Sequence, residues 1–471
     1  MTPSAKLIVP SVVPLLAKLP KGSTRTLPVL CPENKLLHKF ECLTDLEENI
    51  PTICHSANVG FVEWSQTPYT HKISVFKRAA ELLAQRKDAF VDGHLAIGGP
   101  GWFANFNVDG AIKQIEQYVA CMSAPDGVIP KTSATRLALT RRRPLGPVLA
   151  ISPWNAPVIL GARAIAAPLA AGCSVVAKSS EKSPMLSYLL VKCFHDAGVP
   201  SEALQLVHVA PEDTVEATER FLASRHIRKV NFTGSTEVGR QIAMVAAKHL
   251  KPYLLELGGK NCAIVAKDAD LDVAVPTIVN NSWLHKGQIC MSTDKVYVHS
   301  DRYDDFKAKC LDVARQVCAT NPDMKIKSRD SSVEGKVQLQ LEDAIEKGAT
   351  VLFQDPHGPT ILEQVTPDML IYSHETFGPV FSIYQYEDID TVVDMVNSDG
   401  YGLKASIWSA DRLTAIETAS KIQCGGVHIN GSCIHDEATI PHGGVKESGT
   451  GRFNSTWGVE EFTYIQTTTV N

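Results

Sequence analysis

The chain has 471 residues, of which 44% are hydrophobic and 21% charged, and its net charge is −5 at pH 7. Because a single hydrophobic core stops growing near roughly 250–300 residues, this length predicts at least two domains. Charges of both signs are interspersed, which argues against nucleic-acid binding, and no run of about 18 uninterrupted apolar residues is present to cross a membrane.

The N-terminal third carries few periodic signals. Residues 1–60 are rich in proline and are expected to be irregular, apart from short strand-like runs such as 6–9. Residues 70–100 place apolar side chains at helical spacing with charges between them, which predicts helix. Residues 128–142 alternate in character and are followed by a third consecutive arginine, which indicates an exposed strand or arm.

From residue 147 onward, short apolar runs alternate with helical stretches. The predicted strands are 147–151, 174–178, 205–209, 229–232 and 253–257, and the predicted helices are 158–171, 184–197, 212–224 and 235–249. This alternation predicts an α/β fold in which helices cover both faces of a parallel sheet, with ligands at the carboxyl ends of the strands. A second α/β region follows at 258–440, and 462–470 is a strand that needs a partner.

Twelve cysteines are scattered along the chain, and no two form a C-x-x-C pair. In a chain this long the pattern is not that of a disulfide framework or a zinc ribbon, so we expect no metal site. Most of the thiols are expected to be small buried hydrophobes in a reducing compartment, which indicates the cytoplasm.

Polar residues follow three of the predicted strands. Asn155 stands in a rigid turn between two prolines; its amide can donate to an oxyanion or can simply form the turn. Lys178 and Glu181 either grip one ribose together or belong to a solvated charged loop. Gly234 and Ser235 open a helix that can bind phosphate, although the segment is not G-x-G-x-x-G and also suits an ordinary helix start.

Two further residues are candidates for direct roles in catalysis. Glu256 ends an apolar strand, where desolvation raises the pKa of a carboxyl and suits a general base. The alternative is a buried glutamate paired with a nearby lysine. Cys290 is either a nucleophile or a buried structural thiol, and its surroundings have to decide.

Taken together and in this order, the motifs resemble the aldehyde dehydrogenase superfamily from about residue 60 to the end. The segments that carry the resemblance are 154–155, 232–235, 256–260, 287–290 and 375–379. Similarity to the branch that oxidises salicylaldehyde, vanillin and related aromatic aldehydes comes from 157–161 with Arg163, 210–213, 428–431 and 435–437.

The resemblance implies a mechanism. The Cys290 thiolate adds to the aldehyde, and the Asn155 amide and the Cys290 backbone N–H hold the oxyanion of the thiohemiacetal. Hydride transfer to the nicotinamide then leaves a thioester, and Glu256 activates the water that hydrolyses it.

The resemblance also implies NAD as cofactor, with NADP as the alternative. The residues that match cofactor-binding positions are Trp154, Lys178, Glu181, Gly234, Ser235, Gly239, Glu375 and Phe377. A carboxylate at Glu181 repels a 2′-phosphate, so we expect NAD to be preferred.

The same resemblance implies that the chain divides into three parts. They are a Rossmann-like NAD-binding domain (1–125 and 145–257), an α/β catalytic domain (258–440) and oligomerisation strands (126–144 and 458–471). The strands predict a homodimer or homotetramer. A small aldehyde is the other expected partner.

Some positions depart from the family pattern. The stretches 321–331 and 357–364 are shortened, and His442 stands where the family usually has phenylalanine. We expect Arg163, two helical turns after Asn155 and so on the same helix face, to recognise a polar ring substituent together with His442. Alternatively, Arg163 binds a neighbouring carboxylate and His442 only stacks.

Two other functions stay open for such a chain. One is an acylating enzyme that passes the thioester to coenzyme A, a type that generally lacks the base found here as Glu256. The other is a non-catalytic relative that acts as a binding or structural protein.

Overall fold

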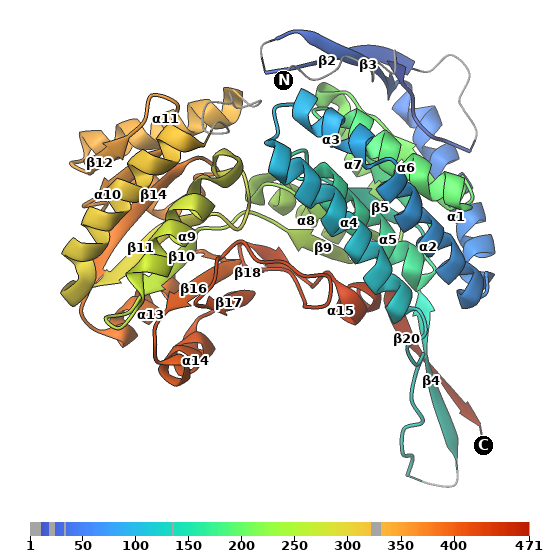
Figure 1. The fold of residues 1–471 in the computed structure, drawn as a ribbon. Coiled ribbons are helices and arrows are strands. Elements are labelled where there is room, and N and C mark those ends of the chain that lie inside the picture. The colour runs from blue at the N-terminus through green and yellow to red at the C-terminus, as the bar shows by residue number, and fades with distance from the viewer. Residues whose placement is uncertain (1–10, 18–23, 33, 134–135, 322–330, 471) are drawn as a thin grey trace. The chain divides into compact units, whose positions relative to one another are not determined.

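The computed structural model describes residues 11–17, 24–32, 34–133, 136–321 and 331–470 (Figure 1). The chain divides into two compact units, the first made of 1–255, 437–441 and 451–471 and the second of 256–436 and 442–450. Within the described ranges, every helix is too short or too polar to cross a membrane.

The first unit opens with strands and four helices. Their bounds are β1 Ser11–Val12, β2 Thr24–Leu30, β3 Leu36–Leu43, α1 Leu46–Gln66, α2 Tyr69–Gln85, α3 Lys87–Ala96 and α4 Gly101–Cys121. The expectation of an irregular segment before residue 60 is wrong, because β2 pairs antiparallel with β3 and α1 follows directly. Pro51 lies inside α1 and obscured its periodicity. The strand-like run 6–9 lies outside the described residues.

A parallel sheet forms the centre of this unit. In spatial order it contains β7, β6, β5, β8 and β9, which are Leu204–Val207, Val175–Lys178, Val148–Ile151, Lys229–Thr233 and Tyr253–Glu256. The helices between them are α5 Pro157–Ala171, α6 Pro184–Ala197, α7 Thr214–Ala223 and α8 Thr236–Lys248. The pairings of β5 with β6 and β8 and of β6 with β7 are parallel, as predicted. The strand order reverses at β5, so the loops after β5 and β8 flank the place where such sheets bind ligands.

The two predicted arm strands pair with each other. β4 (Leu137–Pro144) and β20 (Thr463–Val470), the latter preceded by α15 (Ser455–Glu460), run antiparallel and extend away from the helices of this unit (Figure 1). The other edge of β4 donates from the N–H groups of Thr140 and Arg142 to residues 128 and 126. The outer edge of β20 pairs with no other strand in the part of the chain that the structure describes.

The second unit is a second α/β layer structure. Its main sheet has the order β12-β13-β14-β11-β10-β16-β17, and all its pairings are parallel except that of β12 with β13. The sheet strands are β10 Asn261–Val265, β11 Thr293–His299, β12 Thr350–Gln354, β13 Thr360–Glu363, β14 Val380–Tyr386, β16 Lys404–Trp408 and β17 Gly426–Ile429. The helices are α9 Leu271–Trp283, α10 Tyr303–Thr320, α11 Ser331–Glu346, α12 Leu370–Ser373, α13 Ile389–Ser398 and α14 Arg412–Lys421, and the short strands are β15 Tyr401–Gly402, β18 Val445–Lys446 and β19 Gly449–Thr450. Apolar clusters pack on the sheet, one around Trp283 and Phe381 and another around Tyr297 and Ile407.

Candidate active site

Cys290 lies on a tightly folded loop between α9 and β11. The backbone is left-handed at His285, Lys286 and Gly287, with φ of 49°, 60° and 69°. A Cβ on Gly287 would lie 2.1 Å from the carbonyl oxygen of residue 378, so this position requires glycine. The Asn261 amide donates to the carbonyl of Cys290 at 2.8 Å, which ties the loop to the start of β10.

The surroundings of Cys290 differ from those of most other thiols. Cys290 is partly exposed, so the alternative of a buried structural thiol does not describe it. Burial is the first cause of a raised pKa at ten of the twelve cysteines, namely Cys42, Cys54, Cys121, Cys173, Cys193, Cys262, Cys310, Cys318, Cys424 and Cys433. Burial thus disfavours the thiolate, which is the reactive form, at these ten positions.

The structure brings Cys290 and Glu256 together within the second unit. Sγ of Cys290 lies 3.8 Å from Oε1 of Glu256, and the Glu256 side chain is almost fully buried. Lys260, four residues further along the chain, lies 3.5 Å from Asp294 and donates to the Thr376 hydroxyl at 2.8 Å.

His442 contacts Glu256, which departs from its expected role in substrate recognition. Its Nε2 hydrogen-bonds Oε1 of Glu256, and its Nδ1 lies 3.5 Å from Oδ1 of Asp436. All three side chains are buried. Sequence reasoning singled out His442 as unusual and did not assign Asp436 a role. The only signal was the exchange of phenylalanine for histidine, and nothing in the sequence indicates that this ring meets a glutamate 186 positions earlier.

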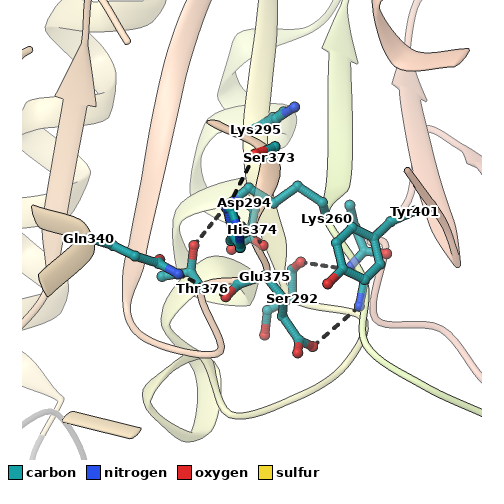
Figure 2. Close-up of polar contacts among 12 residues, drawn as sticks. Lys260, Ser292, Asp294, Lys295, Gln340, Ser373, His374, Glu375, Thr376 and Tyr401 are labelled. Carbon is teal, nitrogen blue, oxygen red and sulfur yellow. Dashed lines mark hydrogen bonds and ion pairs between the residues drawn. The ribbon is translucent and has the colours of Figure 1, made fainter. Parts of the chain in front are cut away.

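Glu375 belongs to a buried polar cluster with Lys260, Asp294 and Thr376 (Figure 2). Its carboxylate accepts from the N–H of Gly259 at 3.2 Å. Burial is the first cause that raises the pKa of Glu375, to about 7. This carboxyl group therefore loses its proton at a higher pH than an exposed glutamate does.

Phe377 lines a pocket in the second unit, next to the segment that carries Glu375. The pocket has a volume of about 560 Å³, and its lining includes Lys286, Gln288, Val337 and Phe377. Phe377 has a left-handed backbone, with φ of 50°. The segment 357–364, expected to be shortened, contributes two of its residues to the lining and then forms β13. Most of 321–331 lies outside the described residues.

The expected cofactor residues of the first unit follow β5, β6 and β8. Lys178 is buried, which lowers the pKa of its ammonium group, and the charge of Glu181 opposes that effect. The solvated-loop alternative therefore does not fit Lys178. The Ser235 hydroxyl caps α8 by accepting from the N–H of Val238 at 3.4 Å. The indole ring of Trp154 lies 5.2 Å from the ammonium nitrogen of Lys182.

Close packing accounts for the two glycines among the expected cofactor residues, Gly234 and Gly239. A Cβ on Gly234 would lie 2.4 Å from the ring of Phe232, so a side chain at 234 would have to displace that ring. Gly239 is buried within α8. Both observations are compatible with a phosphate site at the start of α8, because helix N-termini in general favour bound anions.

The expected geometry of Asn155 and Arg163 is wrong. Helix α5 begins at Pro157, so Asn155 precedes the helix and helical periodicity does not relate the two residues. Arg163 is fully buried, and its guanidinium carbon lies 5.6 Å from the centre of the Phe453 ring. Asn155 is buried at the end of the loop after β5.

Comparison with known proteins gives consistent matches. The model of the Aldehyde dehydrogenase family matches residues 20–468. The chain is 38% identical over 424 residues to a vanillin dehydrogenase of a Pseudomonas species, with 88% of each chain covered. It is 36% identical over 427 residues to a salicylaldehyde dehydrogenase of Pseudomonas putida, again with 88% of each covered. A crystal structure of a salicylaldehyde dehydrogenase from Pseudomonas putida G7 complexed with salicylaldehyde matches with a TM-score of 0.93 at 31% identity, over 98% of each chain.

Proposed function

The chain belongs to the aldehyde dehydrogenase family, and from this premise we propose that it oxidises an aromatic aldehyde through a thioester on Cys290. Oxidation of an aldehyde to the carboxylic acid with NAD(P) is the activity of the protein. The assignment of individual residues and of the substrate class is our proposal. The observation that carries it is the distance of 3.8 Å between Sγ of Cys290 and Oε1 of Glu256.

In the proposed mechanism, Cys290 attacks the aldehyde carbon and Glu256 acts afterwards. We retain the Asn155 amide and the backbone N–H of Cys290 as donors to the oxyanion, on the strength of the sequence motifs. Glu256 then takes a proton from the water that hydrolyses the thioester. A carboxylate this close to the nucleophile suits the role, because it lies within reach of a water at the acyl carbon.

The residues present fit a dinucleotide cofactor. Lys178 offers a buried ammonium group, the start of α8 at Ser235 offers a helix N-terminus, and Glu375 offers a buried carboxyl group. We assign Lys178 and Glu181 to the adenosine ribose, Trp154, Gly234, Ser235 and Gly239 to the neighbourhood of the pyrophosphate, and Glu375 and Phe377 to the nicotinamide ribose and ring. The bound NAD(P) supplies the acceptor for the hydride.

An aromatic substrate is supported by the names of similar proteins, which include vanillin, salicylaldehyde and benzaldehyde dehydrogenases. The acylating alternative is disfavoured by the presence of Glu256 beside Cys290. The non-catalytic alternative is disfavoured by the same pair. We keep Arg163 as a candidate for recognition of a polar ring substituent, and the contacts of His442 suggest a different role for that residue.

We also propose a homo-oligomer, a dimer or a tetramer, that assembles through β20. This strand presents an outer edge and the exposed side chains of Tyr464 and Ile465. Unpaired polar edges of this kind readily accept another strand. All twelve cysteines are free, which is compatible with the proposed cytoplasmic location.

The proposed function is tested by the absorbance of NADH with a panel of aldehydes. We expect kcat/KM to be higher for vanillin, salicylaldehyde and benzaldehyde than for a straight-chain aldehyde of similar size. Preference for long aliphatic aldehydes throughout would refute the aromatic assignment. The variant Cys290→Ala should lose oxidation and still bind NAD, and a variant that keeps a tenth of the wild-type kcat would exclude Cys290 as the nucleophile.

A further inference from the structure

The side-chain amide of Asn261 joins the loop that carries Cys290 to two strands of the second unit. Its Nδ2 donates to the backbone carbonyl of Cys290 at 2.8 Å and to that of Ser292 at 2.9 Å. Its Oδ1 accepts from the backbone N–H of Lys404, at the start of β16, at 3.0 Å. Two carbonyls need a donor and one N–H needs an acceptor, so these partners allow only one orientation of the amide. Asn261 therefore holds the loop against the starts of β10 and β16.

The junction around Asn261 is closely packed. Asn261 is 3% exposed. A Cβ on Gly259 would lie 2.7 Å from the carbonyl oxygen of Cys290 and 2.8 Å from Oδ1 of Asn261, so the backbone of residue 259 lies directly against this contact. A buried carbonyl that loses its donor is costly because water does not readily replace it. The conformation of the loop therefore depends on the amide.

Two hydrogen bonds hold the peptide units on either side of the Cys290 Cα atom. The carbonyl of Ile289 accepts from the N–H of Ser292 at 2.9 Å, and the carbonyl of Cys290 accepts from Asn261. A peptide unit is planar and trans, so holding its carbonyl also sets its N–H, which points the opposite way. The first bond thus directs the N–H of Cys290, which is proposed as an oxyanion donor. The two planes together set the direction of the Cα–Cβ bond that carries Sγ.

We propose that Asn261 is a positioning residue for acylation, because it aligns both Sγ and the backbone N–H of Cys290 for attack on the aldehyde. This inference rests on the proposed role of Cys290. In that step the thiolate Sγ bonds to the carbonyl carbon, and an electron pair of the C=O double bond moves to the oxygen, which becomes the oxyanion of the thiohemiacetal. Asn261 acts through the Cys290 loop and takes no part in bond making.

The test replaces the amide in two ways. Asn261→Ser is neutral, and its shorter side chain no longer reaches the two carbonyls. Asn261→Asp keeps the shape and the acceptor but turns a carboxylate oxygen towards the two carbonyls. The matched controls are the same substitutions at Asn397, whose amide also joins backbone groups of the second unit. It donates to the carbonyl of Lys421 and accepts from the N–H of Gln423, both at 2.8 Å.

Two rates are measured at saturating NAD. The NADH burst in rapid mixing reports acylation, which needs the thiolate and the oxyanion donor in register. Alkylation of Cys290 by iodoacetamide, followed by mass spectrometry of its peptide, needs the thiolate alone. In Asn261→Ser we expect the burst rate to fall about 10- to 100-fold, the loss expected for a misplacement of about 1 Å, while alkylation stays within about twofold of the wild type. Both Asn397 controls should match the wild type in both rates.

Asn261→Asp adds a pH signature. Burial and two facing carbonyl oxygens raise the pKa of a carboxyl, so this one should ionise near neutral pH. Below that range the protonated carboxyl can again donate one hydrogen bond to the loop, and above it the carboxylate repels both carbonyls. The burst rate relative to the wild type should therefore recover as pH falls through neutrality. This variant also keeps the inference testable if Asn261→Ser does not fold.

Several results would overturn the inference. A lower Tm with a wild-type burst rate would show that Asn261 only supports the fold. Equal losses of burst and alkylation in Asn261→Ser would show that Asn261 acts on the thiolate and not on its alignment. A burst rate of Asn261→Asp that stays at a constant fraction of the wild type across pH would also contradict it. Activity retained in Cys290→Ala refutes the proposed function instead, and this result is independent of the Asn261 variants.

Discussion

Replacing Gly258 by alanine tests the assignment of Glu375 to the cofactor. A Cβ at this position would lie 2.5 Å from Oε2 of Glu375 and 2.7 Å from Oε1, closer than nonbonded atoms approach. Because Glu375 is buried, its carboxylate can retreat only by loosening the hydrogen bond of 3.2 Å from the N–H of Gly259. The group that has to move is therefore the one assigned to the nicotinamide ribose.

The size of the effect follows from the hydrogen bond that the ribose loses. A hydrogen bond to a charged group contributes about 1.5–3 kcal/mol. We therefore expect the Kd of NAD, measured by titration calorimetry, to rise roughly 10- to 150-fold in Gly258→Ala. The matched control is Gly335→Ala in α11, where an added Cβ meets no atom within 4 Å. The control should bind NAD as the wild type does and should gain about 0.5–1 kcal/mol in stability.

One result would refute the reasoning directly. If Gly258→Ala is folded, with an unchanged Tm, and binds NAD with the wild-type Kd, then Glu375 does not hold the ribose. A general loss of stability is distinguished by the Tm. The variant Glu375→Gln gives a second measure that introduces no clash, and it should weaken NAD binding in the same direction.

The remaining predictions concern cofactor choice, pH, substrate and assembly. Wild-type kcat/KM should favour NAD over NADP by about 5- to 150-fold, because Glu181 repels the 2′-phosphate. The variant Glu181→Ala should reduce this ratio. Equal kcat/KM values for the two cofactors in the wild type would contradict the assignment of Glu181. Because burial raises the pKa of Glu375 to about 7, its carboxylate ionises as pH rises through that value. Calorimetric NAD affinity should therefore increase with pH in the wild type and stay flat in Glu375→Gln. Arg163→Leu should lower kcat/KM roughly 10- to 150-fold for a hydroxylated benzaldehyde and much less for benzaldehyde, and an equal loss for both would show that this buried arginine supports the fold. Light scattering should give an oligomer, whereas a 51.2 kDa monomer at micromolar concentration would contradict the arm assignment, and Ile465→Lys on exposed β20 should weaken assembly.

Much of the α/β order could be predicted from local signals. Helix α6, predicted at 184–197, has those bounds because Pro184 starts it and Gly198, with φ of 112°, ends it. Helix α5 was predicted at 158–171, one residue after its start at Pro157. Asn155 lay outside the predicted helix as well, so helical spacing was wrongly applied between Asn155 and Arg163. Helix α1 was missed because Pro51 lies inside it. Helix α4 carries no comparable break and was missed as well.

In the candidate site, too, some features could be predicted from the sequence and others could not. The short motifs around Cys290 and Glu256 pointed to these residues, and the structure places them 3.8 Å apart. The contact of His442 with Glu256 depends on how the loop that follows β17 returns to the end of β9. No periodicity or spacing encodes such a long-range contact, so the sequence suggested only that residue 442 was unusual.

The distribution of cysteines has a consequence for chemical selectivity. An aldehyde is an electrophile, and a chain with twelve thiols offers it many sites for unproductive addition. Burial raises the pKa at ten of them. Cys31 and Cys290 are both partly exposed. Thiols add to electrophiles as thiolates. By disfavouring the thiolate, burial therefore protects these cysteines from addition to the aldehyde substrate. In Cys31→Ser, slow alkylation at neutral pH should therefore modify one thiol per chain and count the active sites in a preparation.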